Sequence, residues 1–311
     1  MCVASIAVGA KSIPLADVWD GLFHNTGSGN DVIIRDVRVP RTVLGLTVGA
    51  ALGVAGAVMQ ALTRNPLAEP GLLGVSAGAS ASVVSAISFF GVTSLTGYVW
   101  FAFLGAAVVS TAVYALGGSR GATPVRLALA GTAATAALYG YINAVQLLDA
   151  AALDRLRFWT VGSLASADME TIRRIVPFIT VGLVLALLLA RPLNAMEMGD
   201  ETARSLGAHL TRTRVLSMAA ITLLCGAATA ACGPIVFVGL MIPHVVRAIT
   251  GPDMRWILPY AAVLSPVLLL GADVVGRVVT RPSELQVGIV TALIGGPVFI
   301  QLVRRKRMAK L

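Results

Sequence analysis

Long apolar runs, separated by short polar segments, dominate the chain. A helix that crosses a bilayer needs about 20 largely apolar residues, because a rise of 1.5 Å per residue must cover about 30 Å of hydrocarbon. Such runs predict nine spanning helices, near residues 42–63, 71–91, 97–117, 124–147, 175–190, 215–232, 233–246, 256–276 and 285–303. The pattern therefore predicts an all-α, polytopic membrane protein in which residues 1–311 form a single helical bundle.

A tenth apolar run, at residues 1–10, is too short to span a bilayer. No positively charged segment precedes it, as a signal peptide would require. We interpret this run as the end of a first helix that is largely missing, and we expect the native protein to have an upstream start.

Composition agrees with a membrane location. The chain is 57% hydrophobic and 13% charged, whereas soluble domains are about 25% charged. A pI near 10.2 could indicate nucleic-acid binding. The basic residues are spread over loops, however, so membrane orientation explains them better. We expect lipid, and no nucleic acid, among the partners.

The basic residues also predict which side faces inward. One set of alternate loops, together with the C-terminal tail, holds 14 of the 24 Lys and Arg residues, and the positive-inside rule places this set in the cytoplasm. We therefore expect a multi-pass protein of the inner (cytoplasmic) membrane with a cytoplasmic C-terminus. The set comprises Arg64, Arg120, Arg126, Arg191, Arg204, Arg212, Arg214, Arg247, Arg255, Arg304, Arg305, Lys306, Arg307 and Lys310.

Two small-residue stretches indicate an internal repeat. Residues 49–58 and 226–235 share Gly or Ala at four of ten positions, and small-residue packing between helices explains such a match as well as a repeat does. The expected topology favours a repeat, because the first copy runs inward and the second outward. Inverted repeats commonly build a transport pathway at their interface.

Helix breakers occur at membrane depth. Gly233 and Pro234 precede a short apolar run that contains Gly239 and ends at Pro243 and His244. Broken backbone at this depth is tolerated only against protein or a water-filled cavity. A tolerated kink and a pathway element are both open interpretations. We interpret His244 as a hydrogen-bonding group at a helix end rather than as a metal ligand.

A polar segment at residues 193–214 separates two predicted spans. Its middle predicts a short amphipathic helix that ends at Gly207, with charged residues such as Glu201 and Arg204 between apolar ones such as Leu206. Such a helix suits docking to a cytoplasmic partner. A solvated connector is the alternative interpretation.

Signatures of covalent chemistry are missing from the sequence. It contains no G-x-x-x-x-G-K-[ST] phosphate loop and no H-E-x-x-H zinc motif, so we predict neither catalytic nor metal-binding residues. Asp273 and Arg277 lie four residues apart near a span end and predict a helical ion pair. Isolated acids deep in the spans, which an ion-coupled carrier needs, are not apparent. An ion-coupled carrier and an intramembrane enzyme are therefore the disfavoured alternatives.

Several long motifs resemble the FecCD family, the permeases of ATP-driven importers for iron–siderophores, haem and vitamin B12. The resemblance runs almost from end to end, apart from the missing first helix. The motifs are RVPR from Arg38, GAALGVAGAVMQALTRNPLAEPGLLGVSAGA from Gly49, LALAG from Leu127, FWTVGSL from Phe158, MGDETARSLG from Met198, FVGLMIPHVVR from Phe237, GAD from Gly271 and ELQVGIVTALIGGPVFI from Glu284.

The resemblance implies a division of labour. Two permease copies, as a homodimer or with a related subunit, form the pathway, and each has ten helices. Two ATP-binding subunits dock underneath and use the ATP, so no cofactor binds this chain directly. An external binding protein delivers the ligand, most commonly a ferric siderophore, with vitamin B12 and haem as alternatives.

The resemblance also assigns roles to residues. Arg38, Arg41 and Arg277 are implied to face the binding protein at the outer surface. The residues implied to receive the ATPase are Met198, Gly199, Asp200, Glu201, Ala203, Arg204, Leu206 and Gly207.

Overall fold

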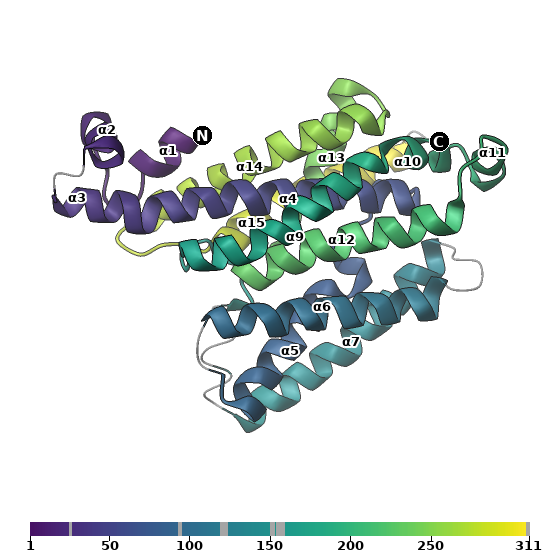
Figure 1. Cartoon of the computed structure of the whole chain (residues 1–311), viewed down its shortest axis with the longest axis horizontal. Helices are drawn as coiled ribbons and strands as arrows, with labels where there is room; N and C mark the ends of the chain where they lie inside the picture. Colours follow the sequence, from purple (N-terminus) through teal and green to yellow (C-terminus); the bar gives the residue numbers. More distant parts are fainter. Residues whose placement is uncertain (25–26, 93–94, 119–123, 150–152, 154–158, 309–311) are drawn as a thin grey trace.

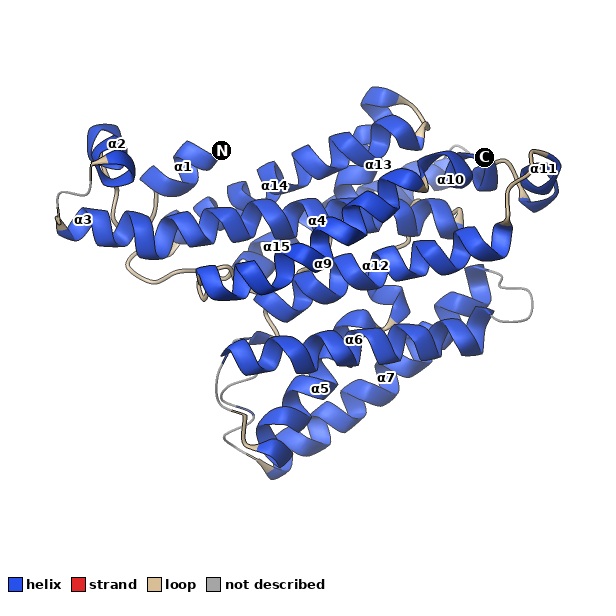
Figure 2. Cartoon of the chain, viewed as in Figure 1, coloured by secondary structure: helices blue, strands red, loops and turns tan. Residues whose placement is uncertain are grey.

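Helices form the whole described fold. The computed structural model describes residues 1–24, 27–92, 95–118, 124–149, 153 and 159–308, and in this part of the chain no strand occurs (Figure 2). The prediction of an all-α fold is confirmed. Arg120, Phe158 and Lys310, which contributed to the predictions above, lie outside the described residues.

The helices follow one another with short connections (Figure 1). In chain order they are α1 (Cys2–Ala7), α2 (Leu15–Phe23), α3 (Gly29–Val32), the π-helix η1 (Ile33–Arg38), α4 (Val39–Thr63), the 3₁₀-helix η2 (Pro70–Leu73), α5 (Val75–Phe90), α6 (Leu95–Gly118), α7 (Pro124–Leu148), α9 (Met169–Leu188), α10 (Ala190–Glu197), α11 (Asp200–Ser205), α12 (Leu210–Cys232), α13 (Val238–Thr250), α14 (Met254–Val279) and α15 (Val287–Met308).

The predicted spans coincide with apolar helices. Among the described residues, six helices are long and apolar enough to cross a membrane: Gly29–Thr63, Gly97–Gly117, Val125–Leu148, Met169–Leu188, Leu210–Cys232 and Met254–Val279. The remaining predicted spans correspond to the shorter apolar helices Val75–Phe90, Val238–Thr250 and Val287–Gln301. The protein is therefore a multi-pass membrane protein.

Two predicted spans begin later than expected because the backbone turns at their starts. The span predicted from residue 71 starts with η2 and then turns at Gly74, where φ is +68°. The span predicted from residue 233 becomes helical only at Val238. Both belong to the three shorter apolar helices named above.

The helix α4 lies at the centre of the bundle and packs against α9, α12, α13 and α14. Its glycines permit this, because a Cβ at Gly49 would lie 2.6 Å from the Cα of Pro266, and a Cβ at Gly56 would overlap the carbonyl of Gly239. Close backbone approach of this kind replaces the hydrophobic drive that lipid does not provide.

Helices α5, α6 and α7 form a second group that reaches the first mainly through α6 and α12. In Figure 1, α4 and α12 run in opposite directions, as the predicted inverted repeat requires. The repeat itself stays a prediction.

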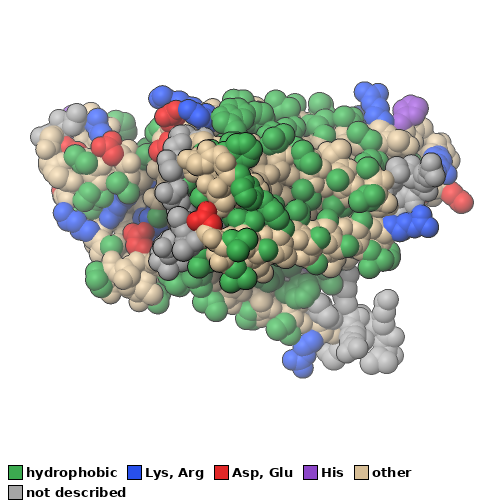
Figure 3. Space-filling model, turned by 90° about the horizontal axis from the view of Figure 1, so that it is seen from below, with side chains coloured by type: hydrophobic (Ala, Val, Ile, Leu, Met, Phe, Trp, Pro, Cys, Tyr) green, Lys and Arg blue, Asp and Glu red, His purple; other side chains and the backbone are tan. Residues whose placement is uncertain are grey.

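Charged side chains gather mainly toward the two ends of the face in Figure 3, with hydrophobic side chains between them. We name these ends by the predicted orientation. The outer end carries α1 to α3, and the cytoplasmic end carries α10 and α11.

Candidate functional site

The predicted coupling segment forms two short helices at the cytoplasmic end. The helix α10 ends at Glu197, the backbone turns at Gly199 with φ of +111°, and α11 follows. Gly207, with φ of +82°, ends α11, and the Ala208 N–H donates to the Ala203 carbonyl. The predicted amphipathic helix and its glycine end are confirmed.

Apolar side chains are exposed on both sides of α11. Met198 is 66% exposed and Leu206 is 64% exposed, whereas Ala203 is fully buried underneath. The charged side chains of Glu201 and Arg204 are also exposed. Large exposed apolar side chains that flank a charged, projecting helix suit a docking surface.

Asp200 fastens the base of α11 to the bundle. Its carboxylate pairs with Arg64, at the end of α4, and with Arg214 in the first turns of α12, where the Nη2 to Oδ2 distance is 2.6 Å. Arg64 adopts φ of +48° to end α4 there. Of the predicted coupling residues, Asp200 therefore holds the segment in place while its neighbours are exposed.

The predicted break is a true interruption of the helix. Gly233, with φ of +73°, ends α12, and residues 233–237 are not helical before α13 begins. Pro243 lies inside α13, with Gly239 one turn before it. His244 lies in the middle of α13, so its predicted place at a helix end is wrong.

A cavity of about 170 Å³ lies beside this break. Glu69 reaches it from the connection between α4 and α5, and its Oε1 accepts a hydrogen bond of 3.0 Å from the Phe237 N–H. This bond satisfies a donor at the start of α13 that has no partner within its own helix. The lining also includes Thr135, Tyr139, Cys225, Thr229 and Pro234.

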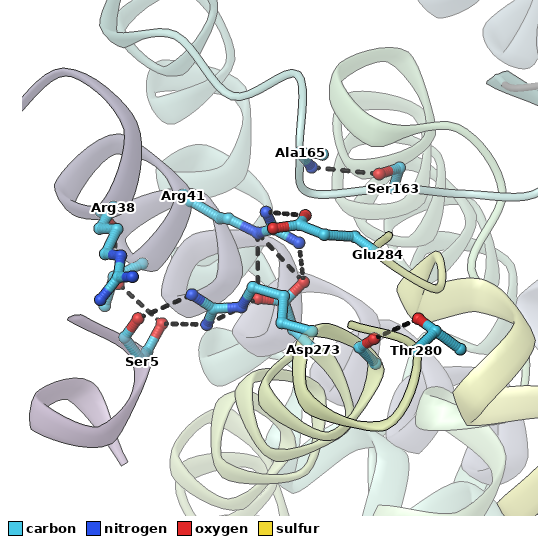
Figure 4. A network of polar contacts seen from close by, with 11 residues as sticks. Ser5, Arg38, Arg41, Ser163, Ala165, Asp273, Thr280 and Glu284 are labelled. Atoms are coloured by element: carbon cyan, nitrogen blue, oxygen red, sulfur yellow. Dashed lines mark hydrogen bonds and ion pairs between the residues drawn. The ribbon is translucent and has the colours of Figure 1, made fainter. Parts of the chain in front are cut away.

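The three predicted docking arginines lie in one region of the outer end, where Figure 4 shows Arg38 and Arg41 near Ser5, Asp273 and Glu284. Arg41 donates to both oxygens of Asp273 and, at 2.7 Å, to Oε2 of Glu284. Arg277 pairs with Asp273 at 3.0 Å, which confirms the predicted helical ion pair, and donates to the Ser5 carbonyl at 2.9 Å.

Arg38 joins the same region through backbone oxygens. It donates to the carbonyls of Ile6 and Lys11, at the end of α1 and just beyond it. Arg38 is the last residue of the π-helix η1, which leads directly into α4. The arginines thus bind α1 to α4 and α14.

The side chains of these three arginines are covered rather than exposed. Arg38 and Arg41 are each 5% exposed and Arg277 is 2% exposed, because carboxylates and carbonyl oxygens surround them. The family resemblance grouped these three arginines, and the sequence pattern gave only Asp273 as a partner of Arg277, not the other acceptors that cover them. Contact with a binding protein stays untested.

Comparison with known proteins agrees with this geometry. The model of the FecCD transport family matches residues 1–305. The chain belongs to the FecCD transport family. It is 47% identical over 305 residues to the ferric enterobactin transport system permease protein FepD of Escherichia coli (strain K12), covering 97% of this chain and 91% of that protein. It is 41% identical over 306 residues to the Fe(3+)-citrate import system permease protein YfmD of Bacillus subtilis (strain 168), covering 98% and 91%.

A solved structure has the same fold. It is a metal-chelate type ABC transporter in an inward-facing conformation, with a TM-score of 0.84 and 27% sequence identity over 97% of this chain and 94% of that one. The FecCD chain is accordingly a permease subunit of an ABC importer, and its fold class was predicted correctly.

Three polar residues at this FecCD site were not predicted from the sequence. Gln60 and Arg247 contact each other between α4 and α13, and Glu69 caps α13. The sequence signal for Gln60 was its place as a single Gln in an otherwise apolar run. Glu69 lies in the connection between α4 and α5, and only the fold brings it to the break.

Proposed function

We propose that this FecCD permease moves a ferric siderophore across the cytoplasmic membrane, using ATP that separate subunits hydrolyse. The observation that carries the proposal is the exposed apolar surface around α11, at Met198 and Leu206. This chain has no phosphate loop of its own. A projecting helix with exposed apolar side chains supports an ATP-binding partner at the cytoplasmic end.

The polar stripe on α7 supports a pathway between two permease copies. Thr132, Thr135, Tyr139, Asn143 and Gln146 recur every three or four residues, so they share one face of the helix. The chain itself buries little of these helices: 33% of the most apolar stretch of α6 and 17% of that of α7. Polar groups facing lipid would lose their hydrogen bonds. A second copy and a water-filled pathway would satisfy them.

The substrate class follows from the relatives. The FecCD proteins compared above are named for ferric enterobactin and for ferric citrate. We therefore propose a ferric chelate as the cargo, delivered by an external binding protein, with haem and vitamin B12 as the alternatives. The iron is cargo, and we propose no bound cofactor for this chain.

Uptake by the reconstituted complex tests the proposal. The permease, its ATPase subunits and its binding protein are placed in liposomes, and entry of ⁵⁵Fe-enterobactin and ⁵⁵Fe-citrate is measured with ATP on the cytoplasmic side. We expect uptake that needs ATP and that an ionophore does not stop. Uptake driven by an ion gradient without ATP would overturn the ATP-coupled proposal. Competition by hemin or cobalamin, but not by ferric chelates, would replace the proposed cargo.

Replacing Met198 and Leu206 by Ser tests the docking surface. Loss of these apolar contacts should release the ATPase subunits from the purified permease while the permease itself still folds. The matched control is Val263→Ser, which removes an equally exposed apolar group at 66% from a membrane helix rather than from α11. Retention of the ATPase subunits by the double variant would contradict the assignment.

A further inference from the structure

Pro243 leaves an unsatisfied carbonyl in the first turns of α13. A helical carbonyl accepts from the N–H four residues later, and proline has none, so the Gly239 oxygen has no donor in its own helix. The side chain of Gln60, from α4, reaches this place. Its Nε2 donates to the carbonyls of Leu240 at 3.2 Å and Gly239 at 3.4 Å. A residue of another helix thus supplies the missing hydrogen bond.

Arg247 fixes the direction in which Gln60 points. Its Nη1 donates to the Gln60 Oε1 at 3.0 Å, and a guanidinium can only donate. Gln60 is 1% exposed, so its amide is shielded from bulk solvent. Its amide nitrogen is thereby directed at α13, and both ends of the amide are in use.

The second arm of Arg247 reaches the coupling segment. Its Nη2 lies 3.2 Å from Oε1 of Glu197, the last residue of α10. The predicted ATPase-coupling surface begins at the next residue, Met198. Arg247 therefore touches both the cytoplasmic segment and the residue that completes α13.

The start of α13 can move only together with its neighbours. A Cβ at Gly56 would overlap the Gly239 carbonyl, so the backbones of α4 and α13 are in direct contact one turn before Gln60. On its other side, Glu69 holds the Phe237 N–H. The first turn of α13 is therefore held by two side chains from outside it, those of Glu69 and Gln60.

We propose that Gln60 and Arg247 are positioning residues that couple the α10–α11 segment to the broken helix beside the cavity. Movement of α10 shifts Glu197, Arg247 follows its carboxylate, and Gln60 transfers the shift to the first turn of α13. This inference rests on the proposed function, because it takes α11 as the place where the ATPase subunits act.

Two substitutions at Gln60 separate the contacts. Gln60→Glu keeps an acceptor for Arg247 but loses the donor to the Gly239 carbonyl, whereas Gln60→Met loses both. Arg247→Lys keeps the charge but lacks the planar fork that serves two acceptors at once. The matched control is Arg255→Ala, which removes an exposed ion pair to Asp253 at the same end without contact to α13.

The experiment uses the complete complex with its ATPase subunits in liposomes. We measure ATP-driven ⁵⁵Fe-enterobactin uptake, ATP hydrolysis and the hydrogen exchange of backbone amides 237–242 with and without ATP and vanadate. In the wild type, nucleotide should change exchange in this segment. All three variants should retain hydrolysis and subunit association but lose this change, with uptake per ATP falling about five- to tenfold, the lower range for coupling between distant sites. The Arg255→Ala control should behave as wild type.

The outcomes distinguish this inference from the proposed function. If the wild-type complex neither binds ATPase subunits nor takes up the iron probe, the proposed function fails. If the wild type transports, and the Gln60 and Arg247 variants keep both the nucleotide-dependent exchange and the uptake per ATP, the coupling role is overturned. A variant that loses the fold is recognised by its lower melting temperature, and Arg247→Lys then decides the question.

Discussion

At the outer end of the bundle, the side chains of Arg41 and Asp273 are 6% and 0% exposed, whereas at the cytoplasmic end those of Arg64 and Asp200 are 36% and 33% exposed. Both pairs join helices that are distant in the sequence. A buried pair cannot open without leaving a charge unpaired and desolvated, but water can replace a partner in a half-exposed pair. The contact between α4 and α14 at the outer end is therefore built to stay together, whereas the contact between α4 and α11 at the cytoplasmic end can rearrange.

Asp273→Asn should cause the largest loss of stability. It leaves Arg41 and Arg277 buried without their shared carboxylate, and breaking a buried pair of this kind costs about 3–5 kcal/mol. The measurement is the melting temperature of the purified protein in detergent. The control is Glu170→Gln, which removes an exposed pair with Arg174 at the same end. If Asp273→Asn melts like the wild type and only slows capture of the binding protein, these arginines act in docking after all.

Gly56→Ala should have the next largest effect. The added methyl group would overlap the Gly239 carbonyl, and overpacking of this kind costs about 1–3 kcal/mol. The control is Gly140→Ala on α7, where the added methyl group meets no atom within 4 Å. Thermal unfolding of both variants checks the prediction, and equal stability of the two would show that α4 and α13 do not touch there.

Asp200→Asn should change stability by less than about 1 kcal/mol, because half-exposed ion pairs contribute little. Its effect should appear instead in coupled uptake, since α11 loses its attachment to Arg64 and Arg214. Parallel assays of melting and ATP-driven iron uptake check this. A large loss of stability would place Asp200 with the buried outer pairs and contradict the comparison.

The smallest expected effect is a pH dependence at Glu197. Burial raises the pKa of Glu197, although Arg247 opposes this. Because the pKa is raised in the fold, the contribution of this group to stability is complete at low pH and is lost as pH rises through the folded pKa. The ion pair with Arg247 needs the ionised form of Glu197. On acidification the pair therefore weakens, and it does so at a pH above the usual Glu pKa of about 4.3.

Uptake measured against pH in the wild type and in Glu197→Gln tests this sign. In the wild type, uptake per ATP should fall on acidification, while protonation of Glu197 should not lower the stability of the fold. In Glu197→Gln, uptake per ATP should depend less on pH. Asp253 is the internal comparison. Hydrogen bonds from Arg255 and Asn194 lower the pKa of its carboxyl, so it stays ionised over the same range. Identical profiles for wild type and variant would remove Glu197 from the coupling path.

Local patterns were sufficient to predict the spans and the break. The length of an apolar run depends on one segment alone. Gly233 and Pro234 likewise interrupt a helix regardless of which neighbours it packs against. The spacing of Asp273 and Arg277 likewise gave their ion pair, because four residues make one helical turn.

Contacts between distant segments could not be predicted in the same way. Arg247 is separated from Gln60 by 187 positions, and Arg41 from Asp273 by 232. A lone arginine near a span end has the same sequence appearance whether it is exposed or covered by carboxylates. The burial of Arg38, Arg41 and Arg277 therefore became clear only with the fold.

The hydrogen bond from Gln60 to the Gly239 carbonyl has a consequence for biogenesis. A helix with an unsatisfied carbonyl is costly to leave in lipid, where no water can compensate. During synthesis, α4 emerges well before α13, so the donor is already in the membrane when the interrupted helix arrives. Insertion of α13 then depends on a correctly placed α4. If the order of these two helices were reversed, α13 would have to enter the membrane before Gln60 could donate to its Gly239 carbonyl.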